Sequence, residues 1–236
     1  MNQPHPLIQA ILVPQGAEYQ SVRRGLSRAN ATVPVVPIPV GLLPLSKSLE
    51  TWQQTWQFDS PQPQILLMGL CGSLSADHAI GDVVTYQSCI QEGKESQACA
   101  AELTETLHQV LKVDRVKALT TDRVIHTASE KHQLSQRWGA AVVDMEGAIV
   151  LQSLNPAGIS VAMLRVVSDD CHHNIPNLNP AFRADGSLNS MTLAAQFLKE
   201  PIAATRLMRG AIRGLQTLQS VTTHLFTELG TNASHS

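Results

Sequence analysis

The chain has 236 residues, enough for one substantial domain but few for two, and 43% of them are hydrophobic, which suffices to fill a core. Its formal net charge of -2 argues against nucleic acid as a partner, and no apolar run reaches the ~20 residues of a membrane span. Residues 1–6 lack the charged and apolar regions of a secretory signal. We therefore expect one domain over residues 1–236, located in the cytoplasm, without nucleic-acid binding or stable membrane insertion.

The first part of the chain alternates short apolar runs with amphipathic ones. Residues 8–13 are β-branched and apolar and precede Pro14-Gln15-Gly16, which is typical of a buried strand ending in a turn. Residues 33–40 contain three prolines, so they permit only an irregular or edge strand. Helices are expected over 18–28 and 45–56. A strand over 65–69 then runs into the segment G-L-C-G-S-L at 69–74, which we interpret as a glycine-bearing loop.

The same alternation continues to the end of the chain. The expected strands lie at 81–86, 117–121, 141–143 and 159–167, and the expected helices at 103–111, 129–138, 148–154 and 202–229. Strands that alternate with helices predict an α/β fold, here a single domain with a central mixed, largely parallel sheet flanked by helices.

Three carboxylates stand at or just beyond the ends of predicted strands. These are Glu18, Glu146 and Asp169. Ligands of open α/β sheets bind beyond the carboxyl ends of the strands, and carboxylates there are costly unless they are paired, solvated or functional. Any one of them alone fits a helix-capping role. The three together favour a functional site.

Metal binding has one candidate in the sequence, the run Cys171-His172-His173. The four cysteines show no zinc-like spacing, adjacent side chains on a strand or turn diverge, and no second cluster completes a site. We therefore expect neither a metal nor a cofactor.

The residues around the three carboxylates resemble the motifs of a known family. V-V-D-M-E-G at 142–147 resembles the V-E-M-E-A signature of the nucleoside phosphorylase superfamily, and L-R-V-V-S-D at 164–169 resembles its R-x-I-S-D motif. The segment at 69–74, followed by I-G-D-V-V at 80–84, is similar to the family's G-S-A-G-G-L…V-G-D-I-V. The segments follow the family's order. The resemblance implies a nucleoside phosphorylase-like fold and cleavage of the N-glycosidic bond of a purine nucleoside.

The resemblance also implies a role for each residue that matches a motif. Asp169 is the general acid that protonates N7 of the leaving purine, and Glu18 orients and deprotonates the attacking water. Glu146 accepts hydrogen bonds from the ribose hydroxyls, while Met145 packs against the sugar. The other implied substrate-binding residues are Cys71, Gly72, Ser168, Val124 and Ile125. Val124 stands where the nucleosidase branch carries a phenylalanine, which leaves recognition of the base or sugar open.

The nucleophile follows from a departure from the family pattern. Leu67 and Leu70 stand where the phosphorylase branch carries an arginine and a serine for phosphate, and Arg23 and Arg24 fit a solvated helix face. Water is therefore the favoured nucleophile, with 5′-methylthioadenosine or S-adenosylhomocysteine as the expected substrate. Two alternatives stay open. One is a phosphate-dependent phosphorylase acting on a modified nucleoside such as an adenosylated hopanoid precursor, and the other is a non-catalytic nucleoside-binding protein.

Two further expectations concern surfaces. The family resemblance implies a homo-oligomer. Arg206, Arg209 and Arg213 form one stripe along the last helix, which we interpret as a solvated face, with contact to a membrane surface as the alternative.

Overall fold

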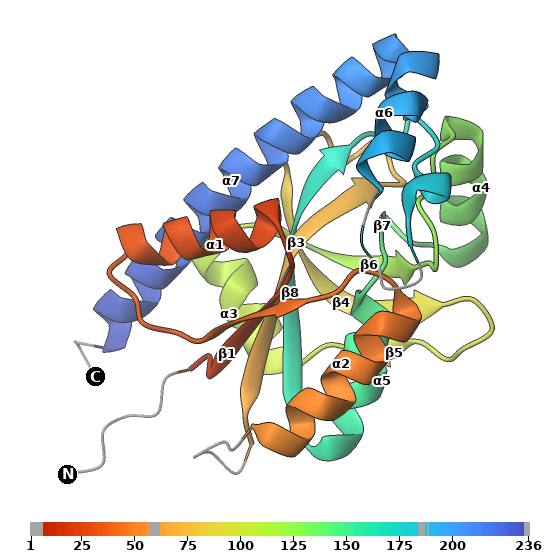
Figure 1. Ribbon diagram of the computed structural model, residues 1–236. Helices are drawn as coiled ribbons and strands as arrows, with labels where there is room; N and C mark the ends of the chain where they lie inside the picture. Colours follow the sequence, from red (N-terminus) through yellow and green to blue (C-terminus); the bar gives the residue numbers. More distant parts are fainter. Residues whose placement is uncertain (1–6, 57–61, 184–186, 188, 234–236) are drawn as a thin grey trace.

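Strands and helices alternate along the computed structural model, which describes residues 7–56, 62–183, 187 and 189–233 (Figure 1). The strands are β1 (Ala10–Pro14), β2 (Val35–Ile38), β3 (Gln64–Ser73), β4 (Val83–Gln91), β5 (Gln97–Ala98), β6 (Asp114–Thr120), β7 (Val142–Asp144) and β8 (Ser160–Asp169). The α-helices are α1 (Ala17–Arg28), α2 (Leu42–Thr55), α3 (Ala101–Leu111), α4 (Ala128–Trp138), α5 (Gly147–Leu154), α6 (Ser190–Lys199) and α7 (Pro201–Ala233), and short 3-10 helices follow α5 and precede α6 at Asn155–Ala157 and Asn179–Ala181.

The strands form one mixed sheet that closes on itself. Its order is β2-β1-β3-β7-β6-β4-β5, and β8 pairs with both β3 and β4, so β3, β8, β4, β6 and β7 make a closed ring. The β1–β2, β1–β3, β3–β8, β4–β6 and β6–β7 pairings are parallel, whereas β3–β7, β4–β5 and β4–β8 are antiparallel. The mixed, largely parallel sheet was predicted, but its closure into a barrel was not.

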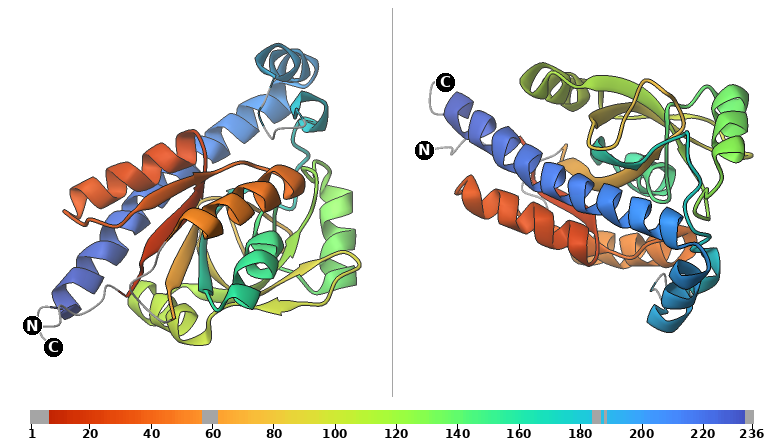
Figure 2. Two further views of the ribbon diagram at one scale, coloured as in Figure 1. Left: turned by 60° about the horizontal axis from the view of Figure 1, so that its bottom comes forward. Right: turned by 90° about the horizontal axis from the view of Figure 1, so that it is seen from above.

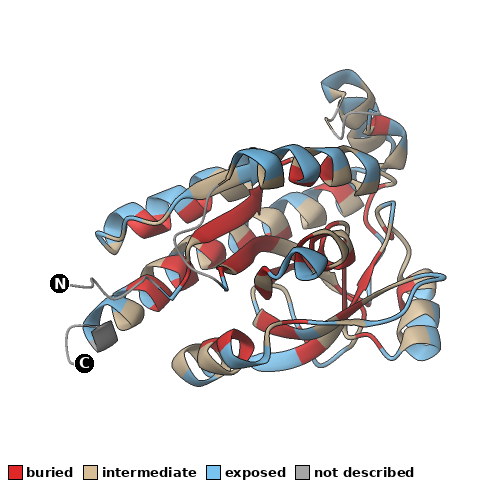
Figure 3. Cartoon of the chain, turned by 90° about the horizontal axis from the view of Figure 1, so that it is seen from below, coloured by how far each residue is buried: buried red, intermediate tan, exposed pale blue. Residues whose placement is uncertain are grey.

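Side chains alternate between two cores on opposite faces of the sheet. Ile65 and Leu67 of β3 belong to the core under α2 and α5, whereas Leu66 and Met68 belong to the core under α1, α3 and α7. β1 and β8 alternate in the same way. Both faces of these strands are covered, which explains why their sequences are apolar throughout (Figure 3).

α7 is the longest helix, with 33 residues, and it runs beside α1 in every view (Figures 1 and 2). The two helices approach closely at Gly25, where a Cβ would lie 2.6 Å from Cβ of Thr222. Farther along, a Cβ at Gly210 would overlap the carbonyl oxygen of Ser168 in β8. α7 therefore contacts both α1, which begins just after β1, and the end of β8.

The predicted elements are present, with two corrections. The glycine segment at 69–74 is not a loop, because β3 continues through it to Ser73, pairing first with β8 and then with β7. Helix α6 was not predicted. Its start is fixed by Asn189, whose side-chain oxygen accepts hydrogen bonds from the backbone N–H groups of Met191 and Thr192. β2 lies at the edge of the sheet, as its prolines require.

None of the helices in the described part of the chain combines the length and the apolarity needed to cross a membrane.

Candidate active site

A cavity of about 470 Å³ opens beyond the ends of β1, β3, β7 and β8. Its size suits a small-molecule ligand, since such pockets span roughly 300–1,000 Å³. All nine residues that the sequence singled out line this cavity: Glu18, Cys71, Gly72, Val124, Ile125, Met145, Glu146, Ser168 and Asp169. The structure thus brings together residues that lie up to 151 positions apart, from 18 to 169, while their chemical roles stay predictions.

Glu18 stands in the first turn of α1 but is turned toward β3. Its Oε1 accepts a hydrogen bond of 2.6 Å from the backbone N–H of Leu70. Burial raises the pKa of the Glu18 carboxyl, although the Leu70 N–H and the nearby Arg165 oppose that rise. A Cβ at Gly69 would lie 2.7 Å from the same Oε1, so glycine is needed for this approach.

Glu146 shares a buried guanidinium with Asp144. One Nη atom of Arg165 lies 3.2 Å from a carboxylate oxygen of each acid, and the arginine side chain is fully buried. Burial is the main cause that raises the pKa of Glu146 to about 8; Arg165 lowers it, and the like charge of Asp144 raises it further. A single cation faces two carboxylates here, so Glu146 holds its proton far more readily than an exposed glutamate does.

Asp144, rather than Glu146, caps the helix that follows. The backbone N–H of Gly147 lies 3.2 Å from each oxygen of Asp144, and the Thr120 hydroxyl donates to Asp144 at 2.7 Å. Glu146 occupies the N-cap position of α5 without a side-chain capping bond. Its carboxylate is therefore available to the cavity and to Arg165.

Asp169 forms an ion pair that the sequence did not reveal. The ammonium group of Lys131, a fully buried side chain on α4, bonds to Oδ2 of Asp169 and donates to the carbonyl of Asp170 at 2.6 Å. Ser168 donates its hydroxyl to the carbonyl of Cys71 at 3.2 Å. Lys131 is 38 positions from Asp169 on an otherwise polar helix, so no motif or spacing pointed to it.

Gly72 and Cys71 lie at a shift in the pairing register of β3 and β8. A Cβ at Gly72 would lie 3.0 Å from Oδ2 of Asp169 and 3.2 Å from Cγ1 of Val143, so a larger residue would crowd the proposed acid. Burial raises the pKa of the Cys71 thiol, which keeps it neutral and leaves it as a wall of the cavity rather than a nucleophile.

The aromatic ring of Phe182 lines the cavity, although no motif in the sequence indicated this residue. Phe182, next to the 3-10 helix at Asn179–Ala181, lines the cavity together with Val124. Asn179 connects the two segments, because its side-chain oxygen accepts from Val124 N–H at 2.8 Å and its amide donates to the Val124 carbonyl at 3.0 Å. Val124, which stands where the family's nucleosidase branch carries a phenylalanine, thus lines the cavity together with the aromatic ring of Phe182.

Among the described residues that line the cavity, the one cation is Arg123, and it pairs with Glu130. Arg165, buried behind the lining acids, pairs with Asp144 and Glu146. Leu67 is buried in the core and Leu70 is half-buried at the cavity wall. Arg23 and Arg24 are exposed on α1, as predicted, and neither is among the described residues of the lining. This lining offers a phosphate dianion no uncompensated positive charge.

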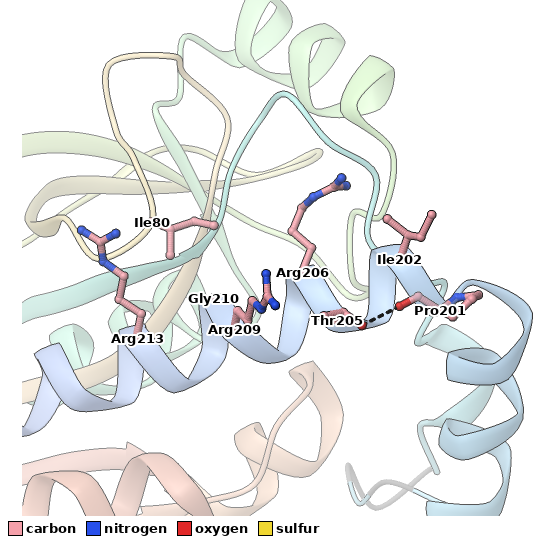
Figure 4. Close-up of a pocket in the computed structure, with 8 residues that line it drawn as sticks. All are labelled: Ile80, Pro201, Ile202, Thr205, Arg206, Arg209, Gly210 and Arg213. Carbon is pink, nitrogen blue, oxygen red and sulfur yellow. Dashed lines mark hydrogen bonds between the residues drawn. The ribbon is translucent and has the colours of Figure 1, made fainter.

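A separate cavity of about 560 Å³ lies along α7 (Figure 4). Arg206, Arg209 and Arg213 project into it from one side of the helix, near Ile80 and Ile202, and none of the eight described lining residues is acidic. Arg209 and Arg213 are exposed, which agrees with the predicted solvated face. Without a carboxylate or histidine, this second cavity has no group for acid–base chemistry.

The run after β8 has a neighbour that the sequence did not indicate as a metal ligand. α4 brings His132 to Cys171 and His172, and the three potential ligand atoms all lie within 4.8 Å of one another. The sequence could not show this proximity, which arises only when α4 packs beside the end of β8.

Comparisons with known proteins agree with the motifs and the fold. The profile of the phosphorylase superfamily matches residues 62–199. The aminodeoxyfutalosine nucleosidase of Helicobacter pylori is 28% identical over 126 residues, 53% of this chain and 52% of that protein, so the match spans about half the length of this curated relative.

Solved structures share the fold. Native futalosine hydrolase of Helicobacter pylori superposes with a TM-score of 0.69 at 15% identity, covering 93% of this chain and 97% of that one. The 5′-methylthioadenosine/S-adenosylhomocysteine nucleosidase of the same species, solved with butyl-thio-DADMe-Immucillin-A, gives a TM-score of 0.63 at 16% identity, covering 91% and 98%. The α/β fold is therefore that of nucleoside phosphorylases and nucleosidases.

Proposed function

The chain belongs to the phosphorylase superfamily, and from this membership we propose that it is a purine nucleosidase, which hydrolyses the N-glycosidic bond of an adenosine derivative. One observation carries the proposal. Glu18, Glu146 and Asp169 converge on one cavity of about 470 Å³, in which the one cation among the described lining residues, Arg123, is paired with Glu130.

Asp169 is the proposed general acid. The bond between C1′ of the sugar and N9 of the purine breaks, and its electron pair moves onto the base. N7 takes a proton from Asp169, which must enter this step protonated, because the ion pair with Lys131 exists only for the carboxylate. The buried ammonium of Lys131 stabilises the carboxylate that remains after this transfer. Lys131 therefore acts on the reaction through Asp169, as a positioning residue.

Glu146 and Met145 are the proposed sugar-binding residues. Both line the cavity, and the carboxylate of Glu146 is anchored by Arg165 at 3.2 Å. When ionised, the carboxylate can accept hydrogen bonds from the two ribose hydroxyls, which fixes the orientation of C1′ between the acid and the water.

Glu18 is the proposed general base for the attacking water. The water oxygen forms a bond to C1′ and gives one proton to the Glu18 carboxylate, so the products are free purine and free sugar. Its raised pKa makes the ionised carboxylate a stronger base than an exposed glutamate is. The Leu70 N–H holds the carboxylate in place at the cavity wall.

Water is favoured over phosphate as the nucleophile for two reasons. The described lining holds Leu70 and one arginine, Arg123, which is already paired with Glu130, so it offers no free cation to a phosphate dianion. In addition, the named relatives are an aminodeoxyfutalosine nucleosidase, a futalosine hydrolase and a 5′-methylthioadenosine/S-adenosylhomocysteine nucleosidase, none of which is named a phosphorylase. The proposed substrates are 5′-methylthioadenosine, S-adenosylhomocysteine and aminodeoxyfutalosine.

The test is to incubate the purified chain with these three nucleosides and with adenosine, with and without phosphate, and to separate the products by chromatography. The expected result is free base and a reducing sugar at equal rates in both conditions. Release that requires phosphate and yields a sugar 1-phosphate would establish the phosphorylase alternative. Tight binding without release of base would favour the non-catalytic nucleoside-binding alternative.

A further inference from the structure

A group of three metal-binding side chains lies at the surface beside the end of β8, outside the cavity described above. Cys171 and His172 follow β8, and His132 is on α4. The sulfur of Cys171 and a ring nitrogen of each histidine lie within 4.8 Å of one another. We propose that these three residues bind a transition-metal dication, for which Zn²⁺ fits best because it prefers nitrogen and sulfur donors.

In the part of the chain that the structure describes, no ion pair and no hydrogen bond to another side chain involves the rings of His132 and His172 or the sulfur of Cys171. The Cys171 thiol interacts with its own backbone, and the two rings contact each other. The adjacent His173 differs, because its Nδ1 lies 2.9 Å from Oδ1 of Asp170. The two free rings are not stacked, since their centroids lie 6.4 Å apart at an interplanar angle of 55°.

The geometry needs only a small adjustment to surround an ion. Zinc–nitrogen bonds of about 2.0–2.1 Å and zinc–sulfur bonds of about 2.3 Å place tetrahedral donors roughly 3.4–3.6 Å apart. Donors within 4.8 Å reach this spacing by moving about 1 Å. Cys171 is buried and fixed, whereas His132 and His172 are exposed and free to rotate. The open side toward solvent admits the ion and supplies water as the fourth ligand.

The segment that presents the donors is rigid and its charge is suitable for a cation. Oδ1 of Asp170 accepts from the backbone N–H groups of His172 and His173, each at 2.9 Å, which fixes the turn after β8 and adds a negative charge beside the group. Two cations lie in this region: Lys131 is compensated by its ion pair with Asp169, and Arg206, which lines a surface pocket with His172, donates to the carbonyl of Asn174 at 3.5 Å. The charge of Arg206 opposes a bound dication, and the carboxylate of Asp170 offsets it.

Metal binding would tie α4 to the segment after β8. The Lys131–Asp169 ion pair already connects α4 to the end of β8. The metal would connect the same two segments through His132, the next residue on α4, and Cys171, two positions after Asp169. Binding is therefore expected to stabilise this junction, whatever reaction the neighbouring cavity carries out.

The experiment uses the full-length chain, treated with a chelator and kept reduced, and titrates it with Co²⁺ and Zn²⁺. Co²⁺ should produce the visible bands of a tetrahedral site and the ultraviolet band of a thiolate–cobalt bond, saturating at one ion per chain. Zn²⁺ should displace it and raise the melting temperature by about 5–10 °C at a concentration a hundred times Kd.

Variants identify the ligands. We expect Cys171→Ser to lose the ultraviolet band and His132→Ala to weaken Zn²⁺ binding at least tenfold, while His173→Ala binds like the wild type. Circular dichroism checks that each variant is folded. Failure of the wild type to bind one equivalent, or equal binding by the double variant of Cys171 and His132, would overturn the proposal. The nucleosidase assay is repeated with chelator added, so that the outcome of the metal titration stays separate from the test of the proposed nucleosidase.

Discussion

At the scale of single residues, three carboxylates of one cavity lie in three different surroundings. Glu18 is buried and bonded to a backbone N–H, Glu146 shares a guanidinium with another acid, and Asp169 pairs with an ammonium. Burial raises the pKa of both Glu18 and Glu146, so each holds a proton more readily than an exposed carboxyl group does. The following predictions separate their roles.

Replacing Asp169 by Asn removes the proposed proton donor without changing its size. Base release should fall by about 10²–10⁴-fold, the usual contribution of a general acid, while the chain stays folded. The measurement is the rate of adenine formation, with circular dichroism as the check of folding. Asp122→Asn, at an exposed acid outside the cavity lining, is the control and should keep wild-type turnover. Unchanged turnover in Asp169→Asn would remove Asp169 from the mechanism.

Replacing Lys131 by Met leaves Asp169 without its counter-ion. We expect kcat to fall on the order of a hundredfold, because the carboxylate formed on proton transfer loses its stabilisation, while KM changes little. Lys131→Arg should restore part of kcat, which a purely structural role would not require. Lys94→Met, at an exposed lysine, serves as the control. A hundredfold rise in KM with an unchanged kcat would contradict the assigned role.

The raised pKa of Glu146 predicts how the free energy of unfolding depends on pH. Its pKa is about 8 in the folded chain against an ordinary value of 4.5, so between these values the folded chain binds more protons than the unfolded chain. The stability that this group provides is complete below about pH 4.5 and is lost as the pH rises through about 8. Glu146→Gln should therefore show a smaller fall in melting temperature from pH 5 to pH 9.

Thermal denaturation followed across that pH range checks the expectation. Glu50→Gln, at an exposed glutamate of α2, should keep the wild-type dependence. Glu18, whose pKa is also raised by burial, contributes in the same direction and accounts for a remaining slope in Glu146→Gln. A fall in Glu146→Gln as steep as in the wild type would show that Glu146 is ionised in the folded chain at neutral pH.

The sequence was sufficient to find residues that belong to local motifs. Glu146 and Asp169 each stand within a short run of characteristic neighbours, so their positions could be predicted without a structure. Lys131 and Phe182 could not be found in this way. Each reaches the site or its proposed acid through packing of a distant segment, and neither has a characteristic neighbour in the sequence.

At the scale of elements, the strands and most helices followed from periodicity, but the connections between strands did not. Closure of the ring depends on the antiparallel pairings of β8 with β4 and of β3 with β7. An alternation of strands and helices predicts parallel neighbouring strands. It does not show which strands that lie far apart in the sequence pair in the antiparallel direction. α6 was not predicted, and none of its side chains is buried in the single chain.

α7 offers a direct test of how one element supports the cavity. Gly210→Ala would drive a Cβ into the carbonyl oxygen of Ser168, next to Asp169, and should destabilise the chain by ~1–3 kcal/mol, lowering the melting temperature by roughly 2–12 °C. Turnover should fall with it, because β8 must shift. The matched control is Gly230→Ala on the same helix, where a Cβ meets nothing within 4 Å.

Alanine at position 230 should be neutral or stabilise the helix by up to about 1 kcal/mol, since alanine favours helices more than glycine does. Differential scanning calorimetry and the base-release assay measure both variants. Equal melting temperatures for Gly210→Ala and Gly230→Ala would mean that α7 can move away from Ser168 at no cost and does not constrain β8.

At the scale of the whole molecule, large apolar side chains gather on α6 and at the start of α7. Met191, Leu198 and Ile202 are 85%, 82% and 78% exposed. Exposed apolar patches commonly mark protein–protein contacts, and the family resemblance implies a homo-oligomer. We therefore expect a second copy of the chain to cover this patch.

Light scattering coupled to gel filtration gives the mass in solution. The wild type should exceed the mass of one chain, and the double change Met191→Glu with Leu198→Glu should shift it toward the monomer. Leu43→Glu on α2, 77% exposed in the single chain, is the control and should leave the mass unchanged. A monomeric wild type would exclude this assembly.

The pairing of α1 with α7 has a consequence for how the chain is made. α1 lies near the beginning of the chain and α7 follows every strand, so some 200 positions separate Gly25 from Thr222, whose atoms meet in the fold. A ribosome-bound chain that has completed all its strands still lacks the cover for Val22 and Leu26. That apolar surface stays open to chaperones until α7 is translated.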